Sequence, residues 1–105
     1  GLHGSNGWRL AEFVAFSRAI VAEPSQHAVA GDFDAGTHFL AFSTPEQCVN
    51  QVARLLDDVE ARDAMARRNW DYYQHWQRPD RLALRVLGLT YAAAGDRAAA
   101  PRCRW

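Results

Sequence analysis

The sequence predicts an α/β fold, and three observations lead to that class. Two short apolar segments, at residues 19–23 and 38–42, have the continuous apolar character of parallel strands that are covered on both faces. A helical pattern precedes the first segment, and helical patterns fill the chain after the second. A sheet of two strands is marginal alone. We therefore expect a partial Rossmann-like unit, with a short parallel sheet of about two strands per chain and four or so helices.

The first expected helix begins at about Trp8, after a glycine-rich turn in which Ser5 or Asn6 can cap it. Apolar spacing predicts that one of its faces packs inward, and this face carries Leu10, Phe13, Val14 and Ser17. The strand at 19–23 follows and ends at Pro24. Residues 25–36 are expected to form a loop that leads into the strand at 38–42.

A second helix is expected after residues 43–47, which offer capping boxes in two overlapping registers with a proline in the first turn. Its expected buried stripe consists of Val49, Val52, Leu55 and Leu56, with Cys48 on the same apolar face. Asp57 or Asp58 starts another helix that runs to about Gln77. One face of that helix carries Ala66, Trp70 and Tyr73.

Pro79 opens the last expected helix, which carries Leu82, Val86 and Leu89 and ends by Gly95. We expect one domain over residues 1–95 and a flexible tail over residues 96–105.

Composition limits the classes of function. Apolar residues make up 49% of the 105 residues, and twelve basic side chains, all arginine, balance twelve acidic ones. This balance argues against a nucleic-acid partner, which requires a basic face. No apolar run approaches the roughly 20 residues of a membrane-spanning helix. The two cysteines, Cys48 and Cys103, form no cluster with metal-ligand spacing, so we expect a cytoplasmic chain without metal or cofactor.

Residues 4–12, Gly-Ser-Asn-Gly-Trp-Arg-Leu-Ala-Glu, followed by residues 17–23, resemble the C-terminal, nucleotide-sugar-binding half of GT-B glycosyltransferases (family-1/family-4-like). In that half, a glycine-containing loop leads into a helix that bears a glutamate, and a strand follows. Residues 38–46 resemble the family's strand and capped helix, and Tyr72-Tyr73 with Arg78-Pro79 resemble the helices that close the domain. The resemblance covers about residues 1–92 and implies a truncated C-terminal domain.

The resemblance also implies which residues bind the donor. Glu12 matches a family glutamate that contacts the ribose hydroxyls, and Gly7 matches a glycine whose backbone approaches the phosphates. A second family glutamate would fall on Gly4, which is a departure from the pattern. The family's basic phosphate clamp and its acceptor domain lie upstream of the matched region. The expected nucleotide-sugar-binding residues are Gly4, Ser5, Gly7, Trp8, Arg9 and Glu12.

The residues themselves support part of this site and leave an alternative open. A helix N-terminus presents unpaired N–H groups that attract anions, and a glycine lets a phosphate approach. By local sequence alone, however, an ordinary helix cap at residues 5–7 and a solvated Glu12 side chain are the favoured interpretation. Asp32 and Asp34 imitate a metal-binding Asp-x-Asp, yet a solvated turn is the favoured interpretation. The aromatic side chains at helical spacing are interpreted as core.

We expect a fragment that resembles the donor-binding part of a glycosyltransferase, with no catalytic residue of its own, that binds a nucleotide sugar or a nucleoside diphosphate weakly. Independent transfer is not expected, because donor and acceptor domains must close on a common cleft. The alternative is a small self-associating α/β module with no small-molecule ligand. In either case apolar strands at an open sheet edge recruit other chains. A homodimer or higher homo-oligomer is therefore expected.

Overall fold

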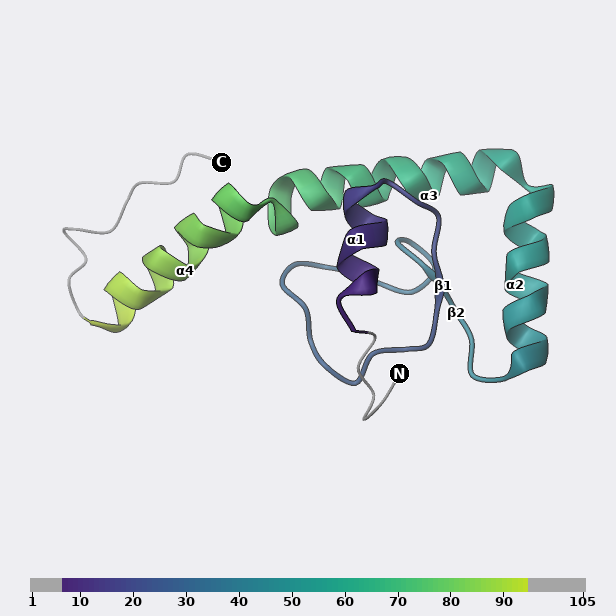
Figure 1. Ribbon diagram of the computed structural model, residues 1–105, viewed down its shortest axis with the longest axis horizontal. Coiled ribbons are helices and arrows are strands. Elements are labelled where there is room, and N and C mark those ends of the chain that lie inside the picture. Colours follow the sequence, from purple (N-terminus) through teal and green to yellow (C-terminus); the bar gives the residue numbers. More distant parts are fainter. Residues whose placement is uncertain (1–6, 95–105) are drawn as a thin grey trace.

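The computed structural model describes residues 7–94, and its elements confirm the predicted α/β class. In chain order the elements are α1 (Arg9–Ala15), β1 (Val21–Ala22), β2 (Leu40–Ala41), α2 (Pro45–Asp57), α3 (Val59–Tyr72), the π-helical turn η2 (Tyr73–Gln77) and α4 (Pro79–Ala93). In Figure 1, α1, the two strands and α2 lie beneath the long α3, and α4 extends away from them. The predictions for Ser5, Asn6, Cys103 and the tail at 96–105 concern residues outside the described range.

The two strands pair in parallel, as expected, with Val21 opposite Leu40 and Ala22 opposite Ala41. The Leu40 N–H donates to the Ile20 carbonyl at 2.9 Å. Each strand has two residues rather than the five predicted. Pro24, which has no N–H to donate, limits the ladder at one end. At the other end, a turn occupies the residues before Phe39, so the second strand begins later in the chain than predicted.

Capping side chains start two of the helices where the sequence indicated. The Thr44 Oγ1 accepts the Gln47 N–H at 3.2 Å, and the Gln47 Oε1 accepts the Ser43 N–H at 2.8 Å. Of the two predicted capping registers, the structure therefore uses the one that starts at Thr44. Asp58, rather than Asp57, caps α3 by accepting the Ala61 N–H at 2.9 Å.

Several predicted buried faces were wrong. In α2 only Leu55 is buried, whereas Val49 and Leu56 are 67% and 64% exposed. In α3 the buried residues are Met65, Asn69 and Tyr72, so its buried face lies one position before the predicted Ala66, Trp70 and Tyr73. In α1 Val14 is buried but Phe13 is exposed. A two-stranded sheet covers only a narrow stripe of each helix, whereas apolar periodicity marks a wider one.

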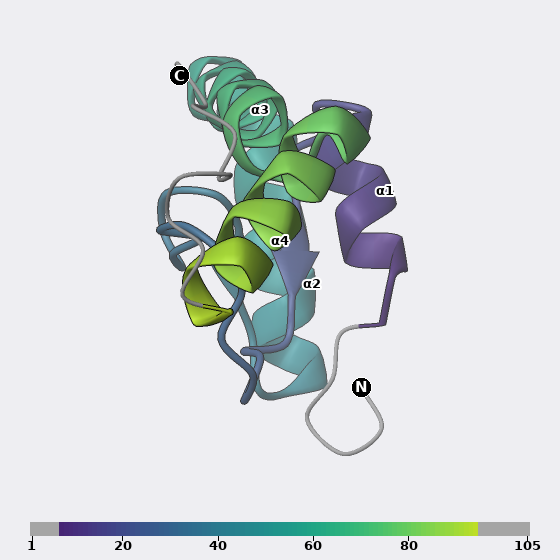
Figure 2. The same ribbon diagram turned by 90° about the vertical axis from the view of Figure 1, so that its left-hand side faces the viewer.

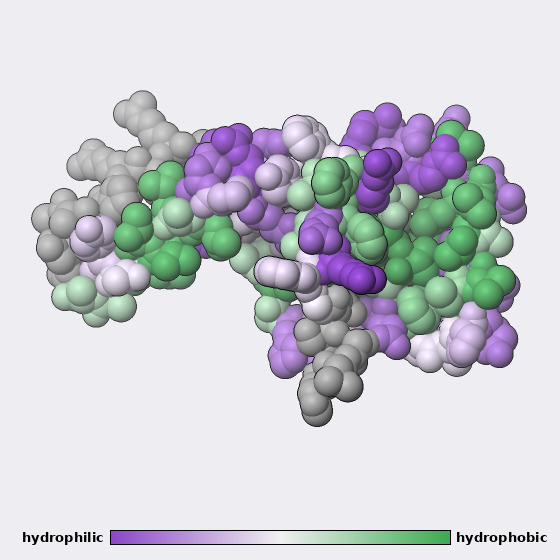
Figure 3. All heavy atoms as spheres, in the orientation of Figure 1, coloured by the Kyte–Doolittle hydropathy of each residue, from purple (hydrophilic) through white to green (hydrophobic). Residues whose placement is uncertain are grey.

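The core consists of two small clusters on either side of the sheet. One cluster contains Val14, Ile20, Phe39 and Tyr72, and the other contains Leu40, Leu55 and Met65. Helix α3 packs against α1 and α2 and supplies side chains to both clusters. Figure 3 shows apolar side chains left at the surface over α4 and over the end of the molecule that carries α2.

The fully buried Asn69 joins three segments of the chain. Its Nδ2 donates to the carbonyl oxygens of Arg18 and His38, at 2.7 and 2.9 Å. Arg18 precedes β1 and His38 precedes β2, so one amide group on α3 holds the entrances of both strands. This contact fixes where the sheet begins relative to the helix.

The loop between the strands passes close to η2 at Gly31. The backbone of Gly31 has φ +79°, and a Cβ at this position would lie 2.6 Å from the Trp76 ring. Gly36 has a similar φ of +82°, but an added Cβ there would meet nothing within 4 Å. The positive φ therefore favours glycine at both positions, and at Gly31 the Trp76 ring also leaves no room for a Cβ.

We predict that Asn69→Asp lowers the free energy of unfolding by roughly 2–4 kcal/mol, because two buried carbonyls lose their donor and a carboxyl group is buried instead. Urea denaturation measures this change. Asn50→Asp, on the exposed part of α2, is the matched control and should stay within about 0.5 kcal/mol of the parent protein. Equal effects of the two substitutions would contradict the role of Asn69.

Gly31→Ala should destabilise the protein more than Gly36→Ala. Both substitutions place an alanine in the left-handed region, which costs on the order of 1–2 kcal/mol. Only the first adds contact with the Trp76 ring, so its cost should be clearly larger. Denaturation curves followed by tryptophan fluorescence compare the two, and equal stabilities would show that Trp76 does not pack on Gly31.

Candidate functional site

A hollow of about 490 Å³ lies between α1, the loop at Val29 and Ala30, η2 and the start of α4. Its walls are largely apolar and aromatic, and they include Trp8, Val29, Tyr73, Trp76 and Leu82. We name this hollow the aromatic pocket. Its volume lies within the range of about 300–1,000 Å³ that is typical of small-molecule sites.

One face of α1 forms a wall of the aromatic pocket. Trp8, Ala11, Glu12 and Ala15 line it, at the spacing that places residues on one side of a helix. Among the described residues that line the pocket, Glu12 is the only one with a charged side chain. A carboxylate beside apolar walls accepts hydrogen bonds from a ligand's hydroxyl groups, while aromatic faces pack on its rings.

Trp76 is held in place by its neighbours on the loop and on α4. The Arg85 guanidinium lies over the Trp76 ring, with its central carbon 4.0 Å from the ring centroid, and Gly31 lies against the ring. The Tyr72 hydroxyl donates to the Ala30 carbonyl and so joins the loop to α3. Burial raises the pKa of Tyr72, although Arg85 and a hydrogen bond with Gln77 oppose this shift. The pocket is therefore built on restrained side chains.

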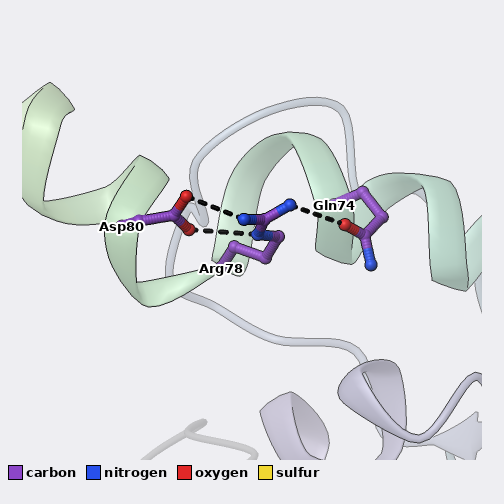
Figure 4. Close-up of polar contacts among 3 residues, drawn as sticks. All are labelled: Gln74, Arg78 and Asp80. Atoms are coloured by element: carbon purple, nitrogen blue, oxygen red, sulfur yellow. Dashed lines mark hydrogen bonds and ion pairs between the residues drawn. The ribbon is translucent and has the colours of Figure 1, made fainter.

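Arg78 fixes the point at which α4 leaves η2, as Figure 4 shows. Its Nε and Nη2 donate to the two carboxylate oxygens of Asp80, at 3.0 and 2.8 Å, and its Nη1 donates to the Gln74 Oε1 at 3.1 Å. Desolvation acts to raise the pKa of Asp80, but the hydrogen bonds from Arg78 and from backbone amides lower it overall. This arrangement sets Pro79 and Leu82 against the pocket.

The structure brings together only part of the predicted site. Trp8 and Glu12 both line the aromatic pocket, whereas Arg9 lies on another side of α1, beside a separate hollow that Phe13 and Val21 also line. Gly7 has φ +62° and immediately precedes the first turn of α1. Gly4 and Ser5 lie outside the described residues.

Sequence reasoning missed the pocket residues that lie outside α1. Val29, Trp76 and Leu82 come from three distant segments, and only their tertiary arrangement makes them neighbours. The spacing of Trp8, Ala11 and Ala15 was a usable signal, because it marks a second apolar face of α1. That face was overlooked in favour of the stripe through Phe13.

A second, polar hollow of about 250 Å³ lies beside His38, and Asp32, Arg68, Asp71 and His75 also line it. The His38 Nδ1 accepts the Asp34 N–H at 3.2 Å. Burial lowers the pKa of His38; Asp34 opposes this shift, Arg68 adds to it, and Asp32 also opposes it. Within residues 7–94, no three His, Cys, Asp or Glu side chains gather as a metal site would require.

The lowered pKa of His38 makes stability depend on pH. As the pH falls, the folded protein binds fewer protons at His38 than the unfolded chain does. The contribution of neutral His38 to the free energy of unfolding is therefore present above pH 6.5 and is lost as the pH falls below that value. The free energy of unfolding, measured in urea at pH values from about 7.5 to 5, should therefore decline. The decline should be smaller in His38→Asn.

His27→Asn controls for the loss of one exposed imidazole in the same loop. If His38→Asn and His27→Asn have the same pH profile, the assignment to His38 is wrong.

Within residues 7–94, every helix is too short or too polar to cross a membrane. Comparison with curated proteins and with solved structures gave no match. A family model described as glycosyl transferase-like matches residues 2–87, a span that includes every element from α1 to the first half of α4. This match covers most of the chain and confirms the glycosyltransferase resemblance at the level of the family. The chain therefore belongs to the glycosyl transferase-like family.

Proposed function

We propose that the aromatic pocket binds the donor of a glycosyl transfer, a nucleotide sugar, and that this chain is the donor-binding part of a glycosyltransferase. The position of Glu12 carries the proposal, because its carboxylate is the charged group that the described residues present to a pocket otherwise lined by apolar and aromatic side chains. Membership of the glycosyl transferase-like family supports this class of ligand.

In the proposed complex, the base packs on the aromatic wall formed by Trp8, Tyr73 and Trp76. The ribose hydroxyls donate to the Glu12 carboxylate. The diphosphate then lies near the N-terminus of α1, where the N–H groups of the first turn attract anions. Gly7 adopts a backbone conformation that favours glycine at this point.

Binding should be weak. The ribose contact and the backbone contacts each contribute on the order of 1–3 kcal/mol as charge-assisted hydrogen bonds. The side chain of Arg9 lies on another side of α1 and does not line the pocket. The sum is near the roughly 4 kcal/mol that corresponds to millimolar affinity.

We propose no independent catalysis for this chain. Glycosyl transfer requires that a donor and an acceptor are held together while water is excluded. The proposed role of Glu12 as a ribose ligand leaves the pocket, over the described residues, without a second carboxylate for acid–base chemistry. The chain would therefore act with a further domain or partner that holds the acceptor.

A second candidate is a self-associating α/β module without a small-molecule ligand. The large apolar side chains that remain exposed on α2 and α4 favour this alternative. Self-association and donor binding are compatible, so we keep a homo-oligomer as part of both proposals. The cytoplasmic location and the absence of a nucleic-acid partner stay predictions.

Titration with UDP and GDP to about 10 mM, followed by NMR, tests the donor site. We expect the largest shifts at Glu12 and at the indole groups of Trp8 and Trp76. Glu12→Ala should weaken binding about tenfold, which equals the roughly 1.4 kcal/mol of a lost hydrogen-bond partner. Because Glu12 is exposed, the fold should persist.

Glu46→Ala, an equal change in the first turn of α2, is the control and should bind as the parent protein does. The parent protein should bind a nucleotide that lacks both ribose hydroxyls less tightly than it binds the ribonucleotide. The Glu12→Ala variant should bind these two nucleotides equally well. The proposal fails if no shifts appear, or if Glu12→Ala leaves them unchanged.

A further inference from the structure

Helix α4 has almost no packing of its own. Among the described helices and strands it contacts η2 alone, and none of its fifteen residues is buried. Figure 1 shows it as an arm that extends from the body of the molecule, and in Figure 2 it lies in front of the other elements. A helix of about this length is marginal in water unless tertiary contacts stabilise it. Another surface is therefore needed to cover α4.

Four exposed apolar residues of α4 form a narrow stripe along one side. The stripe consists of Leu82, Val86, Leu89 and Ala93, and its three large members are 47%, 54% and 66% exposed. Successive members are four, three and four residues apart, which is the spacing of the seam between two packed helices. The half-buried residues Arg81, Leu84, Arg85 and Gly88 lie outside this stripe, as do the exposed Leu87 and Tyr91.

This stripe is complementary to itself when the helix direction is reversed. Its midpoint falls between Leu87 and Gly88, and reversal about that point exchanges position 82 with 93 and position 86 with 89. An antiparallel pair of α4 helices would therefore set Leu82 against Ala93 of the partner subunit, and Val86 against Leu89 of the partner subunit. Self-complementarity of this kind is what a twofold interface requires.

The charges of α4 also favour an antiparallel pair. Asp80, Arg81 and Arg85 all lie in its first half, and positions 86–93 carry no charge. In an antiparallel pair each charged half lies beside the partner's uncharged half, and the two helix dipoles oppose each other favourably. In a parallel pair the two helix dipoles would instead point the same way.

We propose that a second copy of this chain packs against α4, in an antiparallel pair about a twofold axis, through the seam Leu82, Val86, Leu89 and Ala93. The proposal does not depend on the donor site. The open edges of the two strands, which the sequence indicated as the point of association, have only two residues each and provide few hydrogen bonds. The helix is about 22 Å long, so the interface is small and the expected dissociation constant is micromolar.

Sedimentation velocity at about 1–500 µM tests the association. We expect a monomer–dimer equilibrium that Leu89→Glu weakens at least tenfold. Leu87→Glu is the matched control, because it makes the same change at an exposed leucine of the same helix outside the seam. A monomer at every concentration would overturn the proposal, as would equal effects of the two substitutions.

Cysteine cross-linking tests the orientation, in a chain with Cys48→Ser and Cys103→Ser. The combination of Leu82→Cys with Ala93→Cys should give covalent dimers on mild oxidation. Leu82→Cys alone should not, because an antiparallel pair separates the two copies of this position by about 16 Å. Efficient cross-linking of Leu82→Cys alone would indicate a parallel pair and would overturn the geometry.

Discussion

The arrangement of this small fold depends on the side-chain amide of Asn69. A sheet with two residues per strand has too few backbone hydrogen bonds to fix its own position. Asn69 adds two hydrogen bonds that fix the position of the sheet, because its buried amide donates to the carbonyls that precede both strands. The same face of α3 places Met65 and Tyr72 in the two core clusters. One polar contact thus positions the apolar ones.

Local signals in the sequence were sufficient for the element order, the parallel pairing and the caps. Thr44 and Asp58 act on the next turn of chain, so their roles follow from spacing alone. The buried faces were harder to predict, because they depend on how much of each helix the sheet covers. Buried Asn69 is the clearest case, because it lies at the centre of the buried face of α3 and its polar side chain gives no apolar signal.

In the candidate site, too, the residues of one helix could be predicted from local sequence, whereas the residues that tertiary packing brings together could not. Glu12 and Trp8 belong to one short helix, and the sequence placed both at the site. The remaining walls come from the loop near Val29, from η2 and from α4, segments that no local pattern relates to α1. The π-helical turn and the Arg78 contacts bring those walls together, and neither feature has a sequence signature that periodicity detects.

Leu82 is one wall of the aromatic pocket and also part of the exposed stripe of α4. Because η2 is the only described helix or strand that α4 contacts, the direction of α4 and the width of the pocket change together. Any molecule that prefers one direction of α4 therefore alters affinity in the pocket. By thermodynamic reciprocity, a molecule in the pocket alters the affinity of α4 for its neighbour by the same factor.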